Sequence, residues 1–273
     1  MLVCEVKKMG DILRADVALY QSGLAPSRTA AQKAIEEGRA FADDRRIERP
    51  SEKLPINAKL RVVPREEEYV SRGAYKLIGA IEAFHIDVNG LVCADIGAST
   101  GGFTQVLLRH GAKKVYAIDV GENQLADELR KDDRVVCMEH TNARTLQAGS
   151  LPEKIDLIVY DVSFISATLL YDAMLAISSD NVRIIGLIKP QFEAGRQAIG
   201  KNGIVKKAAD QENAIYRCCD AAKQRGLCMT GLIVSPIHGG DGNTEYLCLF
   251  EKDGGCVSDT QIKACVKTAN TNK

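Results

Sequence analysis

The sequence predicts an α/β fold, with a doubly wound and mostly parallel sheet preceded by a small α+β domain. Between Gly90 and Phe250, compact apolar runs alternate with amphipathic stretches at regular intervals. That alternation is typical of strand–helix units, whose parallel sheet binds ligands at the carboxyl ends of its strands. The apolar run Ile155–Tyr160 is what we expect of a central strand buried on both faces. Residues 11–65 form a different, polar region rich in Arg, Asp and Glu.

The length of the chain and one charged segment indicate how it divides into domains. At about 150 residues per domain, a chain of 273 residues suggests two. Pro64 and the three glutamates that end at Glu68 disfavour a continued strand, so we place the boundary there. We expect an N-terminal domain and linker over residues 1–68 and a larger domain over 69–251. Residues 252–273 read as a polar tail with room for one short helix, and we assign it no function.

The larger domain contains seven strand candidates: Leu91–Ile96, Val115–Asp119, Val135–Cys137, Ile155–Asp161, Arg183–Ile188, Cys228–Val234 and Glu245–Phe250. Helical patterns fall between most of them, notably Thr104–His110, Ala167–Ile177 and Ala208–Gln224. Only a Gly-rich loop separates the last two strands, whereas a parallel crossover needs a dozen or more residues. We therefore expect those two strands to form an antiparallel hairpin.

One helix is well defined in the small domain. Ser27 is a suitable N-cap for the segment that follows it, and Gly38 is a suitable helix stop. Ala31, Ala34 and Ile35 form one apolar stripe that can pack inward. Basic residues elsewhere on and around the helix would then be free to contact phosphates.

The basic residues that we predict to contact RNA are Arg14, Arg28, Lys33, Arg39, Arg45 and Arg46, with Arg72 in the larger domain. Taken as charges alone, they are better explained by a solvated surface. The whole pattern favours RNA, because Arg14-Ala-Asp16, Leu19, Gly23-Leu-Ala-Pro-Ser-Arg28, Ala31, Ile35 and Gly38 resemble an S-four-like RNA-binding module. The resemblance covers about residues 11–63 and implies a helical pair and small sheet that present basic residues to structured RNA. It departs at Asp43-Asp-Arg-Arg46, where the family commonly has a Val-Asn-Gly hairpin.

A glycine-rich loop follows the first strand of the larger domain. The segment Asp95-Ile-Gly-Ala-Ser-Thr-Gly-Gly-Phe103 ends that strand and opens a helix, and glycines let a backbone approach a ligand closely. The next strand ends at Asp119, about twenty residues after Gly97, where an acid can bond ribose hydroxyls. A loop of this kind can also be a tight turn that binds nothing. The strand context and Asp119 favour a cofactor site.

The chemistry of the loop favours S-adenosylmethionine over a dinucleotide. The loop lacks the G-x-G-x-x-G spacing of dinucleotide enzymes, and a carboxylate at Asp95 would repel a pyrophosphate. The same carboxylate suits a ligand with an ammonium group, such as S-adenosylmethionine. The residues that we expect to bind this cofactor are Asp95, Gly97, Ser99, Gly101, Gly102, Phe103 and Asp119.

Four charged residues lie where the predicted sheet opens. Lys76 precedes the first strand, Asp161 ends the fourth, Lys189 ends the fifth, and Glu245 begins the last. Each alone has a structural explanation, as a snorkelling lysine, a helix cap or a solvated edge charge. Two lysines and two acids at the carboxyl edge of one sheet are hard to obtain from packing alone. We therefore predict that these four residues form a catalytic site.

This combination of motifs resembles the FtsJ-type 2′-O-ribose methyltransferases, and with the small domain it resembles the TlyA family, also called hemolysin A. The matching segments are Val70-Ser-Arg-Gly-Ala-Tyr-Lys76, Asp95–Thr104, Asp161-Val-Ser-Phe-Ile165, Lys189-Pro-Gln-Phe-Glu193 and Asn243-Thr-Glu-Tyr246. The resemblance covers about residues 11–250 and implies a Rossmann-like methyltransferase sheet that uses S-adenosylmethionine. It implies methylation of a cytidine ribose in 16S and/or 23S rRNA, with ribosomal subunits as partners. It also places Asn142 near the adenine, where related enzymes often carry Asp.

The four charged residues suit methyl transfer to a ribose 2′-hydroxyl. That hydroxyl is a very weak acid, so attack on a sulfonium methyl benefits from in-line placement and proton removal. We expect Lys189 to orient and deprotonate the hydroxyl, and Lys76 to hold the nucleotide and tune Lys189. Asp161 and Glu245 would position both lysines. A second lysine favours a neutral amine and the carboxylates oppose this, so the sequence leaves the net direction open.

Three other functions stay open at this point. The hemolysin name suggests a membrane-damaging protein, but no run approaches about 18 apolar residues and no apolar signal region opens the chain. We therefore expect no membrane partner. A non-catalytic RNA-binding or ribosome-binding protein is disfavoured by the four filled catalytic positions. A dinucleotide oxidoreductase is disfavoured by the missing G-x-G-x-x-G.

Composition adds little about partners. Thirty-six basic residues balance 36 acidic ones, so net charge does not indicate nucleic acid. Nine scattered cysteines without a C-x-x-C suggest reduced thiols in a cytoplasm. Four separated histidines show no metal-ligand spacing, so we expect no metal. The sequence does not indicate an oligomeric state.

Overall fold

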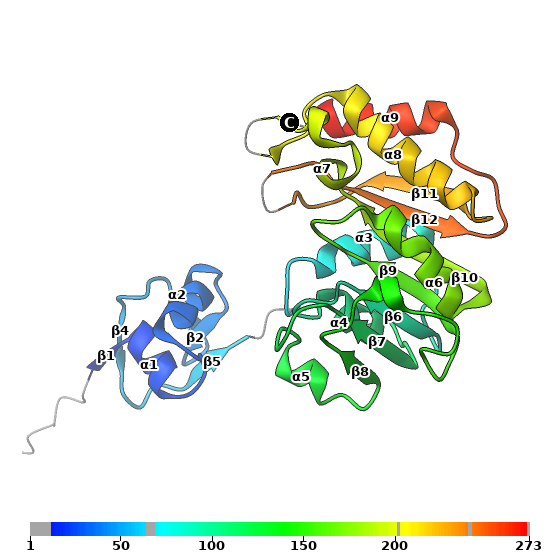
Figure 1. Cartoon of the computed structure of the whole chain (residues 1–273). Coiled ribbons are helices and arrows are strands. Elements are labelled where there is room, and N and C mark those ends of the chain that lie inside the picture. The colour runs from blue at the N-terminus through cyan, green and yellow to red at the C-terminus, as the bar shows by residue number, and fades with distance from the viewer. Residues whose placement is uncertain (1–11, 64–68, 201–202, 240–241, 272–273) are drawn as a thin grey trace, which may run out of the picture. The chain divides into compact units, whose positions relative to one another are not determined.

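The computed structural model describes residues 12–63, 69–200, 203–239 and 242–271, and the chain forms two compact units (Figure 1). The first unit spans Met1–Glu68 and the second spans Tyr69–Lys273. The division coincides with the charged segment that ends at Glu68.

The first unit is a small α+β domain with two short sheets. Its elements are β1 (Ile12–Arg14), α1 (Ala15–Gln21), α2 (Arg28–Glu36), β2 (Ala40–Ala42), β3 (Arg45–Arg46), β4 (Lys53–Pro55) and β5 (Leu60–Val62). Strands β3, β2 and β5 form one antiparallel sheet, and β1 pairs with β4. The side chains of Leu19, Ile35, Ile47 and Leu54 are buried together between the helices and the strands.

Helix α2 begins and ends where the sequence predicts. The Ala30 amide donates a hydrogen bond to Ser27 Oγ at 3.1 Å, which caps the first turn. Gly38 has a φ of +72°, and the Gly38 and Arg39 amides donate to carbonyls in the last turn of the helix. The predicted apolar stripe of Ala31, Ala34 and Ile35 is buried.

The Asp43-Asp44 turn between β2 and β3 keeps the geometry of an Asn-Gly hairpin. Both aspartates have positive φ, +48° and +64°, which is the backbone form of the tight turn that matches strand twist. Asp43 Oδ1 also accepts a hydrogen bond from the Lys59 amide at 3.0 Å, which ties the turn to the segment before β5. The departure from the family pattern therefore changes the charge of this turn and preserves its shape.

The second unit contains a seven-stranded sheet within the described residues. Its elements are α3 (Ala74–Phe84), β6 (Val92–Ile96), α4 (Gly102–Arg109), β7 (Lys114–Ile118), α5 (Asp127–Arg130), β8 (Val135–Met138), η1 (Ala143–Thr145), β9 (Ile155–Tyr160), η2 (Ala167–Leu170), α6 (Tyr171–Ile177), β10 (Ser178–Ile188), α7 (Pro190–Glu193), η3 (Arg196–Ala198), α8 (Ala208–Lys223), β11 (Cys228–Val234), β12 (Tyr246–Glu251) and α9 (Asp259–Thr271). The strand order is β11-β12-β10-β9-β6-β7-β8. Strands β6 to β10 are parallel, and β12 is antiparallel to both neighbours. The predicted fold class and the predicted hairpin are confirmed.

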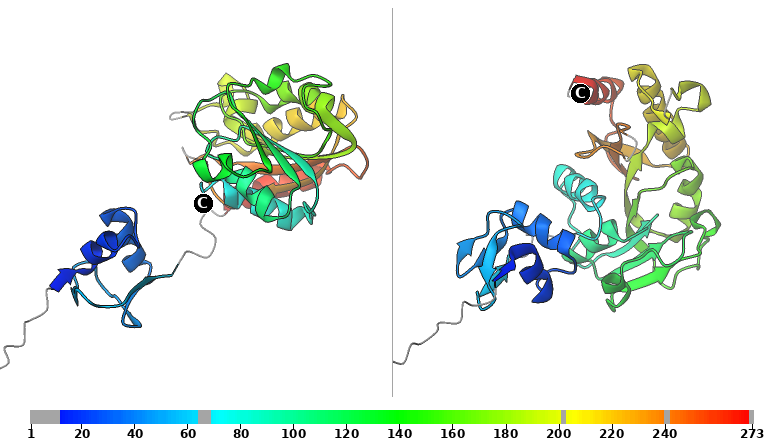
Figure 2. Two further views of the ribbon diagram at one scale, coloured as in Figure 1. Left: turned by 90° about the horizontal axis from the view of Figure 1, so that it is seen from below. Right: turned by 90° about the vertical axis from the view of Figure 1, so that its left-hand side faces the viewer.

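Helices cover both faces of this sheet. Side chains of α3, α4 and α5 pack on one face, and those of α6, α8 and α9 pack on the other. Views turned by 90° show α3 and α8 on opposite sides of the strands (Figure 2). The strand order reverses between β6 and β9, so the helices that follow these two strands, α4 and α6, pack on opposite faces of the sheet. The carboxyl edge of the sheet at this reversal is where a doubly wound sheet binds its ligand.

The C-terminal segment differs from the expected polar tail. Residues Asp259–Thr271 form α9, and its side chains Ile262, Val266 and Ala269 are buried in the same core as those of α8 and β11. Three apolar residues at helical spacing are enough to attach the helix, because its other faces stay in water. The segment is therefore part of the second unit.

One cysteine pair also differs from the expectation of reduced thiols. Cys228 and Cys256 form a disulfide with a Cα–Cα distance of 5.2 Å. The Val257 amide donates to the Met229 carbonyl at 2.7 Å, which returns the chain beside the start of β11 and brings the two cysteines together. The sequence gives no sign of this pairing, because the two residues lie 28 positions apart.

We predict that Ile262→Ala destabilises the second unit by about 2–5 kcal/mol, because it leaves a cavity under α9. Guanidinium unfolding of the full chain measures the effect. The control is Lys263→Ala on the exposed face of the same helix, which should change the free energy of unfolding by less than about 0.5 kcal/mol. Equal effects for the two variants would show that α9 does not contribute to the core.

Candidate active site

The four charged residues predicted to be catalytic meet in one chain of ion pairs. Lys189 Nζ at the end of β10 lies 2.6 Å from Asp161 Oδ1, just after β9. Asp161 Oδ2 lies 3.2 Å from Lys76 Nζ on α3, and Lys76 Nζ lies 2.7 Å from Glu245 Oε2, just before β12. The order along the chain of contacts is therefore Lys189, Asp161, Lys76, Glu245.

Lys76 stays charged in this series although it is buried. The residues Lys76, Lys189 and Glu245 are all buried, and the Asp161 side chain is 20% exposed. Burial lowers the pKa of Lys76, but the carboxylates of Asp161 and Glu245 outweigh it, so the net pKa is raised. Lys76 is therefore a permanent cation that holds two carboxylates in place.

Lys189 has a second neighbour that the sequence analysis did not select. Lys189 Nζ donates a hydrogen bond to Ser163 Oγ at 2.8 Å. Ser163 is exposed and lines both cavities at this edge of the sheet. Ser163 lies two residues after Asp161, in the segment Asp161–Ile165 that resembles the family, and this position could have marked it as a site residue. The serine and the aspartate together point the lysine amine at the open side of the site.

Two cavities meet at the glycine loop. The larger, of about 450 Å³, is lined by Gly97, Ser99, Asp119, Asn142 and Asp161 among others. The smaller, of about 240 Å³, shares Gly97, Ser99 and Asp161 and also reaches Lys189. A long ligand can therefore lie across the loop, with one end beside Asp119 and the other beside Lys189.

Gly97 is required by both backbone conformation and space. Its φ is +82°, and a Cβ on it would lie 2.7 Å from the Asp161 carbonyl oxygen. The loop after β6 therefore passes against the loop after β9 with no room for a side chain. This close approach keeps the floor of both cavities clear.

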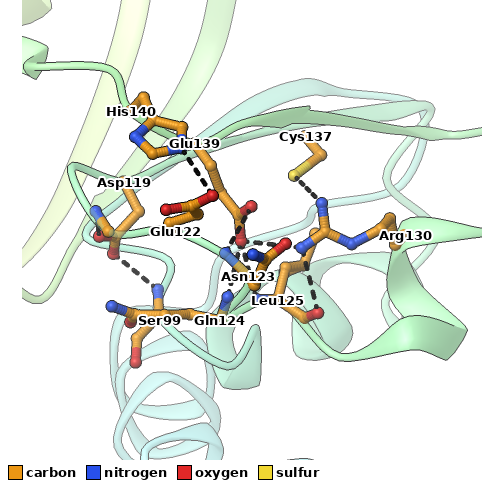
Figure 3. Close-up of polar contacts among 11 residues, drawn as sticks. Ser99, Asp119, Glu122, Asn123, Gln124, Leu125, Arg130, Cys137, Glu139 and His140 are labelled. Atoms are coloured by element: carbon orange, nitrogen blue, oxygen red, sulfur yellow. Dashed lines mark hydrogen bonds and ion pairs between the residues drawn. The ribbon is translucent and has the colours of Figure 1, made fainter.

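Asp119 is fixed by the loops on either side of it (Figure 3). Its Oδ2 accepts a hydrogen bond from the Ser99 amide at 2.8 Å, and its Oδ1 accepts one from the Gly121 amide at 2.7 Å. Each oxygen keeps a further lone pair, and the residue lines the larger cavity. A ribose diol fits such a carboxylate.

Asn142 also lines the larger cavity, and its side chain caps a short helix. Asn142 Oδ1 accepts a hydrogen bond from the Arg144 amide at 3.1 Å, which opens η1. The side-chain amide nitrogen remains available as a donor. Asn142 therefore both lines the larger cavity and caps η1.

Asp95 lies behind the glycine loop. It is fully buried, and its Oδ2 accepts a hydrogen bond from Thr104 Oγ1 at 2.7 Å. Burial raises the pKa of Asp95 to about 7. Its Oδ1 accepts no hydrogen bond from any residue that the structure describes. Asp95 lines neither of the two cavities, so a bridging water would be needed to link its unsatisfied acceptor to a bound ammonium.

The remaining glycine-loop residues shape the smaller cavity. Gly102 and Phe103 line it. Gly101 has a φ of +96°, and a Cβ on it would meet the Leu125 and Leu129 side chains. It therefore packs on the segment that follows Asp119.

Among the described residues, no group of three His, Cys, Asp or Glu side chains is arranged to hold a metal ion.

Two of the predicted RNA-binding residues are brought together on a buried acid. Arg14 Nε donates to Asp16 Oδ1 at 3.0 Å, and Arg28 Nη2 donates to Asp16 Oδ2 at 3.0 Å. The Gln32 amide also donates to Asp16 Oδ2 at 2.9 Å. The hydrogen bond from Arg14 lowers the pKa of Asp16 most, and burial opposes it. The two guanidinium groups stay about half exposed, so they form one fixed basic surface.

The other predicted RNA-binding residues do not join that pair. Arg39 is half-buried and donates to Glu37 and to the Val63 carbonyl, so it ties two segments together. Arg45 pairs with Glu52. Arg45 is exposed, as are Lys33, Arg46 and, in the second unit, Arg72.

A basic aromatic surface on the small sheet was missed by sequence reasoning. Arg61 lies over the Phe41 ring, 4.4 Å from its centroid, and the strand register places Arg46 on the other side of Phe41. These three residues come together only through cross-strand pairing, which cannot be read from the sequence.

Phe164 is a second aromatic residue that the sequence analysis did not select. It is 89% exposed, has a φ of +67° and lines the larger cavity. Its ring lies 5.5 Å from that of Phe192, which follows Lys189 in α7. Exposure of a large ring in a disfavoured backbone conformation is typical of a functional position.

Comparison with known protein families agrees with this geometry. The model of the FtsJ-like methyltransferase family matches residues 69–252. This chain belongs to the FtsJ-like methyltransferase family. An S4 domain model matches residues 13–60, within the first unit.

Relatives of similar length match most of this chain. The chain is 42% identical to the 16S/23S rRNA (cytidine-2′-O)-methyltransferase TlyA of Mycobacterium tuberculosis, over 85% of this chain and 87% of that protein. It is 39% identical to hemolysin A of Brachyspira hyodysenteriae, over 87% of this chain and 99% of that protein. The solved structure "Putative hemolysin from Streptococcus thermophilus" is 39% identical, with a TM-score of 0.72, over 95% of this chain and 96% of that one. Among the described residues, no helix is long and apolar enough to cross a membrane.

The cofactor of this FtsJ-like methyltransferase is S-adenosylmethionine, and we predict that Gly97→Ala weakens its binding about tenfold or more. The added Cβ must push the Asp161 carbonyl away and adopt a backbone form that costs about 1–2 kcal/mol. Calorimetry with S-adenosylmethionine and its demethylated product, with and without ribosomal subunits, measures this. The matched control is Gly149→Ala, whose φ is +86° with open space around the Cβ. Similar affinities for both variants would mean that the loop does not hold the cofactor.

Proposed function

We propose that this protein is an S-adenosylmethionine-dependent RNA methyltransferase that methylates a cytidine ribose 2′-hydroxyl in 16S and/or 23S rRNA. The observation that carries this proposal is the ion-paired series from Lys189 to Glu245 beside the two cavities. It provides an amine, held by two fixed partners, at the place where a nucleotide and the cofactor would meet. The similarity to the M. tuberculosis enzyme supports the substrate.

The cofactor residues support binding of an extended nucleoside ligand. When bound, S-adenosylmethionine supplies an activated methyl group on a positively charged sulfur. In the chain, Asp119 would hold the ribose diol, Asn142 the adenine, and the buried Asp95 would attract the ammonium end. The glycine at position 97 keeps the space between these groups open.

The lysines divide the work at the acceptor hydroxyl. Lys189 is the residue that we assign to orient the 2′-hydroxyl, because its amine faces the smaller cavity and is fixed by Asp161 and Ser163. It would receive the hydroxyl proton in its unprotonated form, after releasing its own proton to solvent. Lys76 stays protonated between Asp161 and Glu245 and thereby sets the position of Asp161. Lys76 therefore keeps its proton and positions Lys189 through Asp161.

Phe164 would support the base of the target nucleotide. A base that leaves its stack gains about 1–3 kcal/mol when it stacks on an aromatic side chain. The Phe164 ring is exposed at the mouth of the larger cavity and backed by Phe192. Because Ser163, which precedes Phe164, contacts Lys189, a nucleotide stacked there would lie near that lysine.

The first unit would supply affinity for structured RNA. Its S4 domain presents the Arg14 and Arg28 pair and the Phe41 surface. Because the chain has no net charge, such local surfaces must provide the contacts to phosphate. We propose ribosomal subunits as the partner, and therefore the cytoplasm as the location. Reducing conditions there would keep Cys228 and Cys256 as two neighbouring thiols.

A purely structural role for the methyltransferase fold is poorly supported. A scaffold has no need of two buried lysines, since buried charges are costly unless they are paired for a purpose. All four catalytic positions are filled and in contact. The enzyme function is therefore the one that the geometry supports best.

We predict that Lys189→Ala folds and binds cofactor but loses on the order of 10²–10⁴-fold in rate, as expected when a general base is removed. Lys189→Arg should not recover the activity, because arginine keeps its proton and its planar fork does not fit a lysine site. Asp161→Asn should also be slower. Single-turnover methylation of ribosomal subunits measures all three, with the exposed Lys113→Ala as control. An arginine variant within a few-fold of wild type would reduce Lys189 to an electrostatic anchor.

We predict that replacing Arg14 and Arg28 together by alanine weakens RNA binding and lowers the salt slope by about one unit per lost phosphate contact. Because Asp16 would then be a buried charge without its partners, the test also includes the triple variant with Asp16→Asn. Filter binding over a salt series measures both. The control is Arg134→Ala, another exposed arginine that pairs with an aspartate. An unchanged affinity and slope in the folded triple variant would exclude these two arginines from the RNA interface.

A further inference from the structure

A carboxylate outside both cavities organises the wall of the larger one. Glu139 follows β8, and its two oxygens accept hydrogen bonds from the amides of three consecutive residues: Asn123 at 2.9 Å, Gln124 at 2.8 Å and Leu125 at 3.1 Å. Arg130 Nη2 adds a fourth contact at 2.8 Å. Figure 3 shows Glu139 between Asp119 and Arg130, with its carboxylate pointing toward Asn123 and Gln124.

The loop that Glu139 gathers is part of the cofactor site. It begins at Asp119, and Gln124 lines the larger cavity. Asn123 has a φ of +52°, so the loop makes a tight turn that exposes consecutive amides in one direction. Such a concave row of amides binds an anion, and here the anion is the Glu139 side chain.

The same loop also packs against the glycine loop. Leu125 is buried against Gly101, where a Cβ would lie 2.8 Å from the Leu125 side chain. The Ala126 amide donates to the Thr100 carbonyl at 3.2 Å. Movement of the loop would therefore displace both Asp119 and the glycine loop.

The charge of Glu139 is secure over the pH range of enzyme assays. The hydrogen bond from Arg130 lowers the pKa of Glu139 most, the three amides lower it further, and the pKa is about 2. A glutamate with an ordinary pKa near 4.3 would begin to lose its charge below about pH 5. Glu139 therefore keeps all four contacts wherever the enzyme can be assayed.

We infer that Glu139 is a positioning residue that sets the affinity for S-adenosylmethionine by holding the Gly121–Ala126 loop between Asp119 and the glycine loop. It does not line the cavity, so it acts through Asp119, Gln124 and Gly101. The Lys189 site lies on the other side of the glycine loop and has its own supports. Loss of Glu139 should therefore affect cofactor binding and leave the rate of methyl transfer intact. This inference rests on the proposed function.

The test compares Glu139→Gln with a matched control in the full-length protein. Glutamine has the same shape but lacks the charge that three amides and an arginine contact, so we expect the Kd for the demethylated product and the KM for S-adenosylmethionine to rise about tenfold or more. The value of kcat at saturating cofactor should stay within about twofold of wild type, and RNA affinity should not change. The control is Glu153→Gln, which removes a carboxylate that pairs with Lys114 and Tyr116 at the start of β7, the opposite end from Asp119.

Each outcome decides the matter. An unchanged Kd, or a fall in kcat equal to the rise in KM, would overturn the positioning role of Glu139. If Glu139→Gln does not fold, Arg130→Met provides the test, and its Kd must rise at least about threefold because it removes one of the four contacts. Failure of the wild-type protein to bind the cofactor or its product, with ribosomal subunits present, would instead refute the proposed function.

Discussion

The site depends on one carboxylate that joins two buried lysines. Asp161 contacts Lys189 through one oxygen and Lys76 through the other. Lys76 also forms an ion pair with Glu245. Removing Asp161 would leave Lys189 without its ion-pair partner, and removing Lys76 would do the same to Glu245; breaking a buried pair typically costs about 3–5 kcal/mol. The fold must therefore bring α3 and the ends of β9, β10 and β12 to one point, and the sheet order does so. Gly97 lets the loop after β6 join them at contact distance from the Asp161 carbonyl.

Two other carboxylates, Asp119 and Glu139, hold the loops around the cofactor cavity. Asp119 and Glu139 follow adjacent parallel strands, and each accepts hydrogen bonds from backbone amides of a neighbouring loop. Backbone amides at loops need partners when they are held in one conformation, and a carboxylate supplies a strong acceptor. The two strand ends therefore fix the loops that form the cavity wall. In the first unit a buried carboxylate holds side chains instead: Asp16 pairs with Arg14 and Arg28 and keeps them in one orientation.

The two units illustrate different limits of sequence reasoning. In α2, the N-cap, the glycine stop and the apolar stripe act over a few residues, so they were predictable and are confirmed. In α9, three apolar residues in a polar segment were too few to distinguish a packed helix from a tail, and burial against α8 and β11 decided it. The Cys228–Cys256 pair likewise depends on a chain reversal that only the packed structure supplies.

The sequence by itself determined the order of strands and helices, the antiparallel end of the sheet and the four charged residues at its edge. These follow from local periodicity, from loop lengths and from the position of polar residues after apolar runs. Only the tertiary structure decided four further contacts: Ser163 with Lys189, Phe164 with the larger cavity, Phe41 with Arg61, and Glu139 with the loop after Asp119. Such contacts join residues that are distant in the sequence or lie in irregular loops, where no periodic pattern records the neighbour. Strand order and loop closure bring them together, and both are set by the packing of the whole sheet.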